Sequence, residues 1–230
     1  MVRQMSLAAL AAATALIATA LATAAFAADE PISSLNGAVN VEPGRHAGSV
    51  SNVNGSIHIG TNAVVGSATT VNGSITADAH ASAAMLITVN GSIHVGPGVH
   101  VAGMVQTVNG SITVEDGADV AAALSSVNGT IRTTAAHVGG GISTVNGGIN
   151  IGPNSRIEGG LHLLPNNGGW FDFLFSWHST PRVVIGPGAS VSGTLLFEQE
   201  VKLYVSDHAT IGPVKGATAI KFSGPQPPSD

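Results

Sequence analysis

The pentad Val71-Asn72-Gly73-Ser74-Ile75 decides the fold, because close copies of it recur along the chain at a nearly constant interval. Seven such pentads are present, and their asparagines are separated by 18, 18, 18, 19, 19 and 18 residues. These asparagines are Asn36, Asn54, Asn72, Asn90, Asn109, Asn128 and Asn146. A fixed period of this length is typical of a repeat protein whose units stack on their neighbours.

Each repeat unit is too short to hold two packed helices, and it carries no apolar stripe with a period of 3.6 residues. Three strands of about four or five residues, each followed by a small turn residue, use up such a unit. Stacking the units at roughly 4.8 Å would bring equivalent residues into register. We therefore predict an all-β fold, a single-stranded parallel β-helix (β-solenoid) with three short strands per coil of 18–19 residues.

Stacking in register predicts columns of like side chains, and three apolar columns are expected to form the core. The first is Leu35, Val53, Val71, Val89, Val108, Val127 and Val145. The second is Val39, Ile57, Ile75, Ile93, Ile112, Ile131 and Ile149. The third is Val41, Ile59, Ala77, Val95, Val114, Thr133 and Ile151. A mixed polar column lies between the second and third apolar columns and is predicted to face solvent. Its members are Asn40, His58, Thr76, His94, Thr113, Arg132 and Asn150.

The Asn-Gly column has two interpretations. In the first, the pentad is a single strand, in which valine, glycine and isoleucine point to one side and asparagine and serine point outward. Alternatively, Asn-Gly is a bend between two sides of the coil, since both residues tolerate the left-handed conformation. We favour the bend. In either case the stacked amides are expected to form a structural ladder rather than a ligand site.

The N-terminus has the layout of a secretory signal peptide over residues 1–27. Arg3 precedes an uncharged run from Met5 to Phe26, which ends in Ala25-Phe26-Ala27. Cleavage after Ala27 is predicted, with an uncleaved membrane anchor as the alternative. The mature chain is expected to lack a transmembrane segment and to be exported, whether periplasmic, at the cell surface or secreted. No cysteine follows the run to accept a lipid.

Composition excludes several functions. The formal net charge is −5, and removal of Arg3 with the signal peptide would leave 7 basic and 13 acidic side chains. An acidic surface disfavours nucleic acid as a partner. The chain has no cysteine, so burial and the hydrogen-bond ladder have to stabilise it without disulfides.

The expected organisation is a leader over residues 28–34, regular coils over 35–164, an aromatic insertion over 165–181, final coils over 182–214 and a tail over 215–230. The insertion contains Trp170, Phe171, Phe173, Phe175 and Trp177. This aromatic group is the candidate interaction patch. It is expected either to cover an open surface of the solenoid or to bind a partner chain, a glycan or a membrane interface.

The sequence shows no arrangement typical of catalysis. The nine histidines lack the paired short spacing of a zinc site. Glu115, Asp116 and Asp119 are the only tight acidic group, and a plain solvated turn explains them better than a calcium site. Phosphate-binding loops and nucleophile elbows are missing. We therefore predict that the chain is not an enzyme and has no catalytic, cofactor-binding or metal residues.

Two families resemble this chain over about residues 35–212. The repeated Thr-Val-Asn-Gly-Ser-Ile is similar to the repeats of putative-adhesin β-solenoids, and Val184-Ile185-Gly186-Pro187-Gly188 resembles bactofilin-type polymer-forming β-helices. The second resemblance implies a right-handed helix and end-to-end polymerisation, although a signal peptide departs from that family's pattern. The expected function is a non-catalytic exported scaffold that self-associates or binds a cell-envelope, glycan or protein surface. The alternative is a carbohydrate-active lyase or hydrolase, which needs a groove with two carboxylates about 5–10 Å apart.

Overall fold

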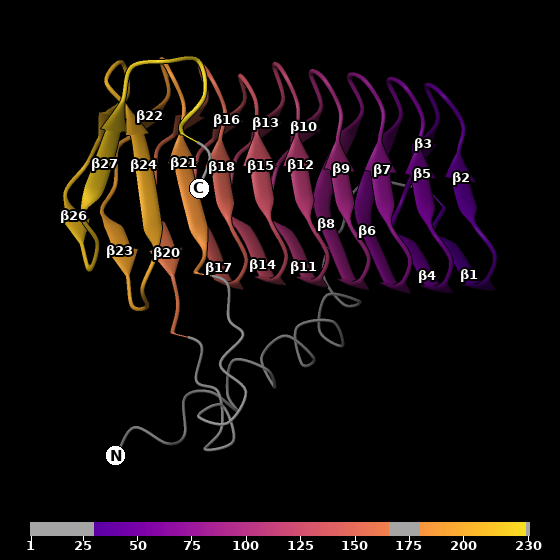
Figure 1. Ribbon diagram of the computed structural model, residues 1–230. Coiled ribbons are helices and arrows are strands. Elements are labelled where there is room, and N and C mark those ends of the chain that lie inside the picture. The colour runs from indigo at the N-terminus through magenta and orange to yellow at the C-terminus, as the bar shows by residue number, and fades with distance from the viewer. Residues whose placement is uncertain (1–29, 166–179, 229–230) are drawn as a thin grey trace, which may run out of the picture.

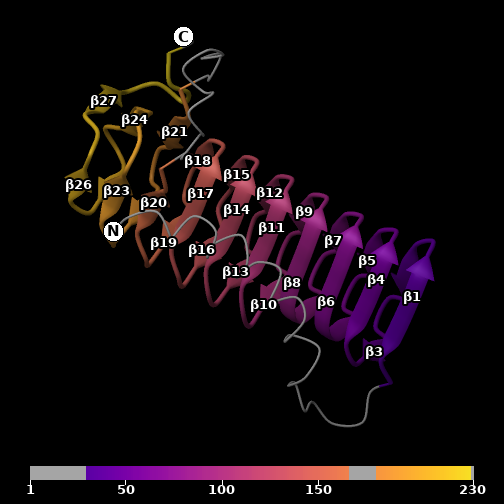
Figure 2. The same cartoon turned by 90° about the horizontal axis from the view of Figure 1, so that it is seen from below.

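The computed structural model describes residues 30–165 and 180–228, and within these ranges the chain is a parallel β-solenoid without a helix (Figures 1 and 2). The predicted fold class is therefore confirmed. A ten-stranded sheet, here called the front sheet, receives one strand from each coil. A 17-stranded sheet supplies the other two sides of the coil as a long row and a short row of strands.

The strands follow one another in the same order in every coil. The front sheet consists of β2 (Val39–Val41), β5 (Ile57–Ile59), β7 (Ile75–Ala77), β9 (Ile93–Val95), β12 (Ile112–Val114), β15 (Ile131–Thr133), β18 (Ile149–Ile151), β21 (Arg182–Ile185), β24 (Lys202–Ser206) and β27 (Ala219–Phe222). The short row consists of β3 (His46–Ala47), β10 (His100–Val101), β13 (Asp119–Val120), β16 (His137–Val138), β19 (Arg156–Ile157), β22 (Ser190–Val191) and β25 (Thr210–Ile211).

The long row consists of β1 (Ile32–Asn36), β4 (Val50–Asn54), β11 (Val105–Asn109), β14 (Leu124–Asn128), β17 (Ile142–Asn146), β20 (Leu161–Leu163), β23 (Leu195–Phe197) and β26 (Val214–Lys215). Two long strands, β6 (Val64–Asn72) and β8 (Ser82–Asn90), run through both rows. Neighbouring coils pair in parallel, with asparagine opposite asparagine, as in Asn54↔Asn72. The 18–19-residue period therefore sets the register of the regular coils.

The second and third predicted apolar columns form the core on the front-sheet side. Every member is buried, from Val39 and Val41 at one end to Ile149 and Ile151 at the other. The polar column between them faces outward, as in the pattern of β5, where His58 is exposed between two buried isoleucines. Alternation along an ordinary strand explains both results.

The first predicted apolar column is not in the core, and this assignment was wrong. Leu35 is 72% exposed and Val53 is 38% exposed, and the valines that follow them in the column are half-buried on the outward face of the long row. The chain bends after the asparagine, so alternation does not continue across it. Within β4 the inward residues are Val50 and Asn52, which places Val53 outside.

The inward positions of the long row hold two other columns. One is apolar and includes Leu86, Val105 and Leu124. The other is hydroxylated and includes Thr88 and Thr107, both buried. The core is therefore apolar on the front sheet and partly polar where the long row approaches the Asn-Gly corner.

The bend interpretation of Asn-Gly is correct, because each asparagine ends a long-row strand and the front-sheet strand begins three residues later. The reason given for the glycine was incomplete. From Gly73 to Gly147 the corner glycines lie outside the left-handed region. A Cβ atom built on Gly91 would instead collide with the carbonyl carbon and oxygen of Gly73 in the coil beneath. Glycine is needed here because the coils stack backbone on backbone.

Left-handed residues occupy a different corner, between the front sheet and the short row. They form a column of mixed composition: Gly44, Asn62, His80, Gly98, Gly117, Ala135, Asn154 and Gly188. Glycine and asparagine are common there, because a positive φ costs these residues least.

The stack extends beyond the predicted boundaries at both ends. β1 begins at Ile32, within the expected leader, and β27 pairs with β24 beyond residue 214, within the expected tail. After β27 the chain returns over the outward face of the front sheet, where an Arg182 Nη donates to the carbonyl oxygen of Pro228 at 2.8 Å. Val184, Tyr204 and Phe222 form a small apolar cluster on that outward face.

Candidate functional site

The seven asparagines of the repeat form one continuous ladder along the Asn-Gly corner. Each side-chain Nδ2 donates to Oδ1 of the preceding asparagine, over distances from 2.7 Å (Asn128 to Asn109) to 3.2 Å (Asn54 to Asn36). The amides are exposed, but each one spends a donor, an acceptor or both on its neighbours. The ladder therefore connects the coils and occupies up to half of the hydrogen-bonding capacity of each amide.

A second ladder lies inside the same corner. The Thr88 hydroxyl donates to the carbonyl oxygen of Gly73 at 2.8 Å, and Thr107 donates to Gly91 at 2.8 Å. Equivalent bonds come from Asn52, Thr70 and Ser126. The hydroxyl column thus satisfies glycine carbonyls that the bend turns toward the interior.

The outward face of the long row is an apolar stripe flanked by small hydroxylated residues. A shallow groove of about 570 Å³ lies on this face in the first coils and is lined by Leu35, Val53 and Val71 together with Ser51 and Thr69. Stacked valines at a spacing of roughly 4.8 Å cover one another in part, whereas Leu35 at the end of the column has a neighbour on one side only. Apolar exposure is therefore greatest at the first coil.

Histidine and carboxylate side chains alternate along the short row. His100 Nδ1 lies 2.9 Å from Asp119 Oδ2, and His137 Nδ1 lies 2.6 Å from Asp119 Oδ1. His137 Nε2 continues the chain to Glu158 Oε1 at 3.3 Å, and an Arg156 Nη contacts the same carboxylate oxygen at 3.4 Å. We call these five residues the histidine ladder.

The histidine ladder shifts the ionisation of its central members. The hydrogen bond that His137 donates to Asp119, assisted by Glu158, raises the pKa of His137 above 6.5, although partial burial opposes the shift. The hydrogen bond from His137, assisted by His100, holds the pKa of Asp119 below 3.8. The two carboxylates therefore stabilise the imidazolium form of His137 and shift its protonation equilibrium toward that form.

Sequence inspection missed the histidine ladder, although a signal was present. His100, Asp119 and His137 are separated by 19 and 18 residues, the period of the asparagines, so they had to share a column. Three further histidine–carboxylate pairs join coils: His58–Asp78 at 3.0 Å, His94–Glu115 at 3.4 Å and His162–Glu198 at 2.8 Å.

The acidic group Glu115, Asp116 and Asp119 does not converge on one point. Glu115 pairs with His94 and Asp119 with His100 and His137. Within residues 30–165 and 180–228, no group of three or more histidine or carboxylate side chains is arranged to hold a metal ion.

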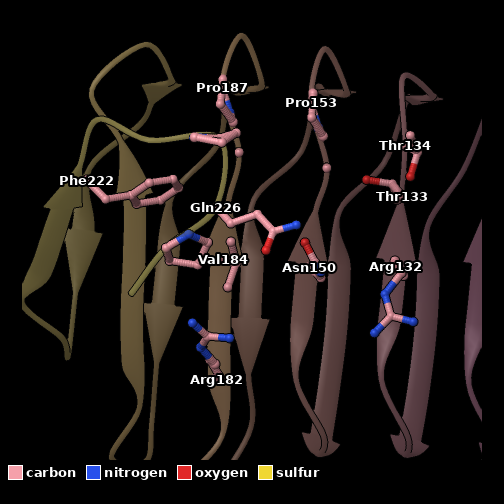
Figure 3. A pocket seen from close by; sticks show the side chains of 14 residues that line it. Arg132, Thr133, Thr134, Asn150, Pro153, Arg182, Val184, Pro187, Phe222 and Gln226 are labelled. Atoms are coloured by element: carbon pink, nitrogen blue, oxygen red, sulfur yellow. The ribbon is translucent and has the colours of Figure 1, made fainter. Parts of the chain in front are cut away.

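A cavity of about 390 Å³ lies between the returning tail and the outward face of β15, β18 and β21 (Figure 3). Its polar lining comes from Arg132, Thr134, Asn150, Arg182 and Gln226. Its apolar lining comes from Val184, Phe222 and several prolines, among them Pro153, Pro187, Pro225 and Pro227. In this cavity a non-repeating segment and the repeating face together surround polar groups.

The aromatic candidate patch, Trp170, Phe171, Phe173, Phe175 and Trp177, lies outside the described residues, as does the signal peptide, residues 1–27. The flanking corner is described. The Gln199 amide donates to the carbonyl oxygens of Val145 at 2.7 Å and Leu164 at 3.0 Å, at the corner where the asparagine ladder ends after Asn146. Gln199 thus ties the next coil to the regular repeat.

Searches with protein-family models, among curated proteins and among solved structures found no match to this chain. In the described parts of the chain, no helix has the length and apolar character needed to cross a membrane.

Proposed function

We propose that the chain is a non-catalytic, exported scaffold that acts through self-association or through binding to a cell-envelope, glycan or protein surface. The proposal rests on the hydrogen bonds that polar side chains make between neighbouring coils along the Asn-Gly corner. The asparagine ladder and the inner hydroxyl ladder both bond neighbouring coils. Such bonding produces long, regular faces and a stiff rod, which suits a structural role.

Export rests on the layout of residues 1–27, and the compartment is proposed to be the periplasm, the cell surface or the exterior. The likeness of the repeats to putative-adhesin and bactofilin-type sequences supports a surface-binding or assembling role. The exposed Leu35 and the groove beside it add an apolar surface at the first coil. Trp170 and Trp177 remain the proposed aromatic contact.

The alternative is a carbohydrate-active β-helix enzyme. Among the described residues, its candidate carboxylates are Asp119 and Glu158, which His137 connects. All three side chains are 39–48% exposed, Asp119 and His137 on two-residue strands and Glu158 directly after β19. A hydrolase or lyase needs its carboxylates in a groove that orients the sugar chain, so this arrangement favours the scaffold.

The test compares assembly and binding of the mature chain, residues 28–230, with matched variants. Sedimentation velocity, electron microscopy and co-sedimentation with isolated cell envelopes are the measurements. We expect the parent chain to assemble or to pellet with envelopes. Assembly or envelope binding should be weaker in the Trp170→Ala/Trp177→Ala variant and in Val53→Ser than in the parent chain. Val64→Ser is the control. The exposed fraction of Val64, 37%, nearly equals that of Val53, but Val64 lies on the short row.

A parent chain that stays monomeric and leaves envelopes unbound would overturn the scaffold proposal. Release of reducing or unsaturated sugars from envelope polysaccharides, abolished by Asp119→Asn, would establish the enzyme alternative instead. If only the tryptophan variant retains full assembly and binding, the aromatic insertion is a cover and Val53 marks the contact surface.

A further inference from the structure

The cavity beneath the tail gathers polar side chains whose hydrogen-bonding capacity is unused. Arg132, Asn150 and Thr134 project from consecutive coils of the front sheet or the turn that follows it, and Gln226 reaches toward Asn150 from the tail (Figure 3). None of these four side chains has a hydrogen-bond or ion-pair partner among residues 30–165 and 180–228. The corner amides of the same protein bond one another, so this set stands apart.

The cavity is also positively charged in an acidic protein. The whole chain has 13 acidic and 8 basic side chains, yet the lining includes two arginines and no carboxylate. The other arginine of this part of the stack, Arg156, is neutralised by Glu158. Among the described residues no carboxylate compensates Arg132, and its guanidinium fork can receive a planar oxyanion with two parallel hydrogen bonds.

Arg182 is held in place at the other side of the cavity. Its guanidinium lies 4.8 Å from the centroid of the Tyr204 ring, and one Nη donates to Pro228. Its Nε is buried without a hydrogen-bond partner among the described residues. Because Arg182 is already held in place, it adds a positive field to the cavity, and ligand binding does not have to offset the entropy of ordering its long side chain.

We infer that this cavity binds a small acidic saccharide. The carboxylate of the sugar acid meets the Arg132 guanidinium in the field of Arg182. The Asn150 and Gln226 amides and the Thr134 hydroxyl each offer both a donor and an acceptor, as sugar hydroxyls require. The proline rings and Val184 form the apolar wall. A volume of about 390 Å³ is within the usual range for a small-molecule site and suits one or two sugar rings.

The experiment is a titration of the isotope-labelled mature chain, followed by amide and side-chain NMR shifts. The probes are galacturonate, its neutral counterpart galactose, and inorganic phosphate. Galacturonate is expected to shift the signals of Asn150 and Gln226 and to bind at least tenfold tighter than galactose or phosphate. Arg132→Gln should weaken galacturonate binding by about tenfold or more, because a charge-assisted pair is lost.

Arg45→Gln is the matched control. It removes the same charge from an exposed side chain five coils away, roughly 24 Å along the axis and beyond the reach of a screened charge. Gln226→Ala provides a second variant, whose tail position leaves the coils untouched. The inference is wrong if galactose binds as well as galacturonate, if phosphate binds equally well, or if Arg45→Gln matches the loss in Arg132→Gln. Absence of binding to all three probes also overturns it. These outcomes do not depend on whether the chain assembles.

Discussion

The coils over residues 35–151 and those over residues 182–222 follow the same backbone path but are held together differently. In the regular coils, Thr88 and its equivalents bond inward-facing glycine carbonyls, while asparagines bond along the corner. In the later coils the inner hydroxyl position is taken by Leu163 and then Phe197, both buried. The later coils also carry an apolar cluster on their outer face.

The difference teaches that the inner threonine and the corner glycine belong together. A tight Asn-Gly bend turns a carbonyl toward the core, and a buried carbonyl needs a donor. At the later corner between β23 and β24, Glu198 to Val201 replace Asn-Gly, and the inner column beside it is apolar.

The largest expected effect comes from substitution of a corner glycine inside the regular coils. Gly91→Ala should destabilise the protein by about 3 kcal/mol or more, because the new Cβ meets the Gly73 backbone and two coils have to separate. Urea unfolding followed by circular dichroism measures this loss. The matched control is Gly37→Ala at the open end of the stack.

Gly37 separates stacking from backbone conformation. A Cβ on Gly37 has no atom within 4 Å, but φ there is +91°. Its substitution should cost only about 1 kcal/mol, the usual penalty of a positive φ. Equal losses at Gly91 and Gly37 would mean that the corner needs glycine for its conformation and not for stacking.

Thr88→Val tests the pairing of threonine with glycine. The substitution keeps the shape of the side chain and removes the 2.8 Å bond to Gly73, so a part-buried carbonyl loses its side-chain donor. We expect a loss of about 1–2 kcal/mol in the free energy of unfolding. Thr113→Val, on the outward face of β12 without a side-chain hydrogen bond among the described residues, should change it by less than about 0.5 kcal/mol. Similar values for both would remove the distinction between the two regions.

The sequence predicted what the period controls. A constant spacing places equivalent residues over one another, so the parallel register, the three strands per coil and the two front-sheet core columns could all be inferred. The outward direction of the valine column could not be inferred, because it depends on whether the inward–outward alternation of one strand continues through Asn-Gly. The bend interrupts this alternation, and Val53 therefore faces solvent.

The functional surfaces show where periodic reasoning ends. The histidine ladder obeys the period and could have been found by aligning His100 with Asp119 and His137. The cavity could not. Gln226 belongs to a segment without a repeat, and its approach to Asn150 depends on how the tail packs on the front sheet, where Pro228 accepts a hydrogen bond from Arg182. Long-range packing of a unique segment leaves no signal in a repeat pattern.

The smallest expected effect is the pH dependence that the histidine ladder adds to stability. The pKa of His137 is raised, so its contribution is complete below 6.5 and is lost as pH rises through the raised value. The pKa of Asp119 is lowered, so its contribution is complete above 3.8 and is lost as pH falls through the lowered value. The ladder should therefore stabilise the fold most between these two pH values.

His137→Gln should lower stability at pH 5.5 by about 0.2–1 kcal/mol, a small amount because solvent screens side chains that are about 40% exposed. The difference from the parent should shrink by pH 9, and thermal unfolding across this range measures it. His46→Gln, in the same column but without a partner among the described residues, should leave the profile unchanged. In β22 and β25 the column holds Ser190 and Thr210 in place of histidine or carboxylate. The histidine ladder should therefore add no pH dependence to the protection of the amides of these two strands from exchange. A pH effect that is equal in both regions would show that the ladder stabilises the whole rod and not its own coils.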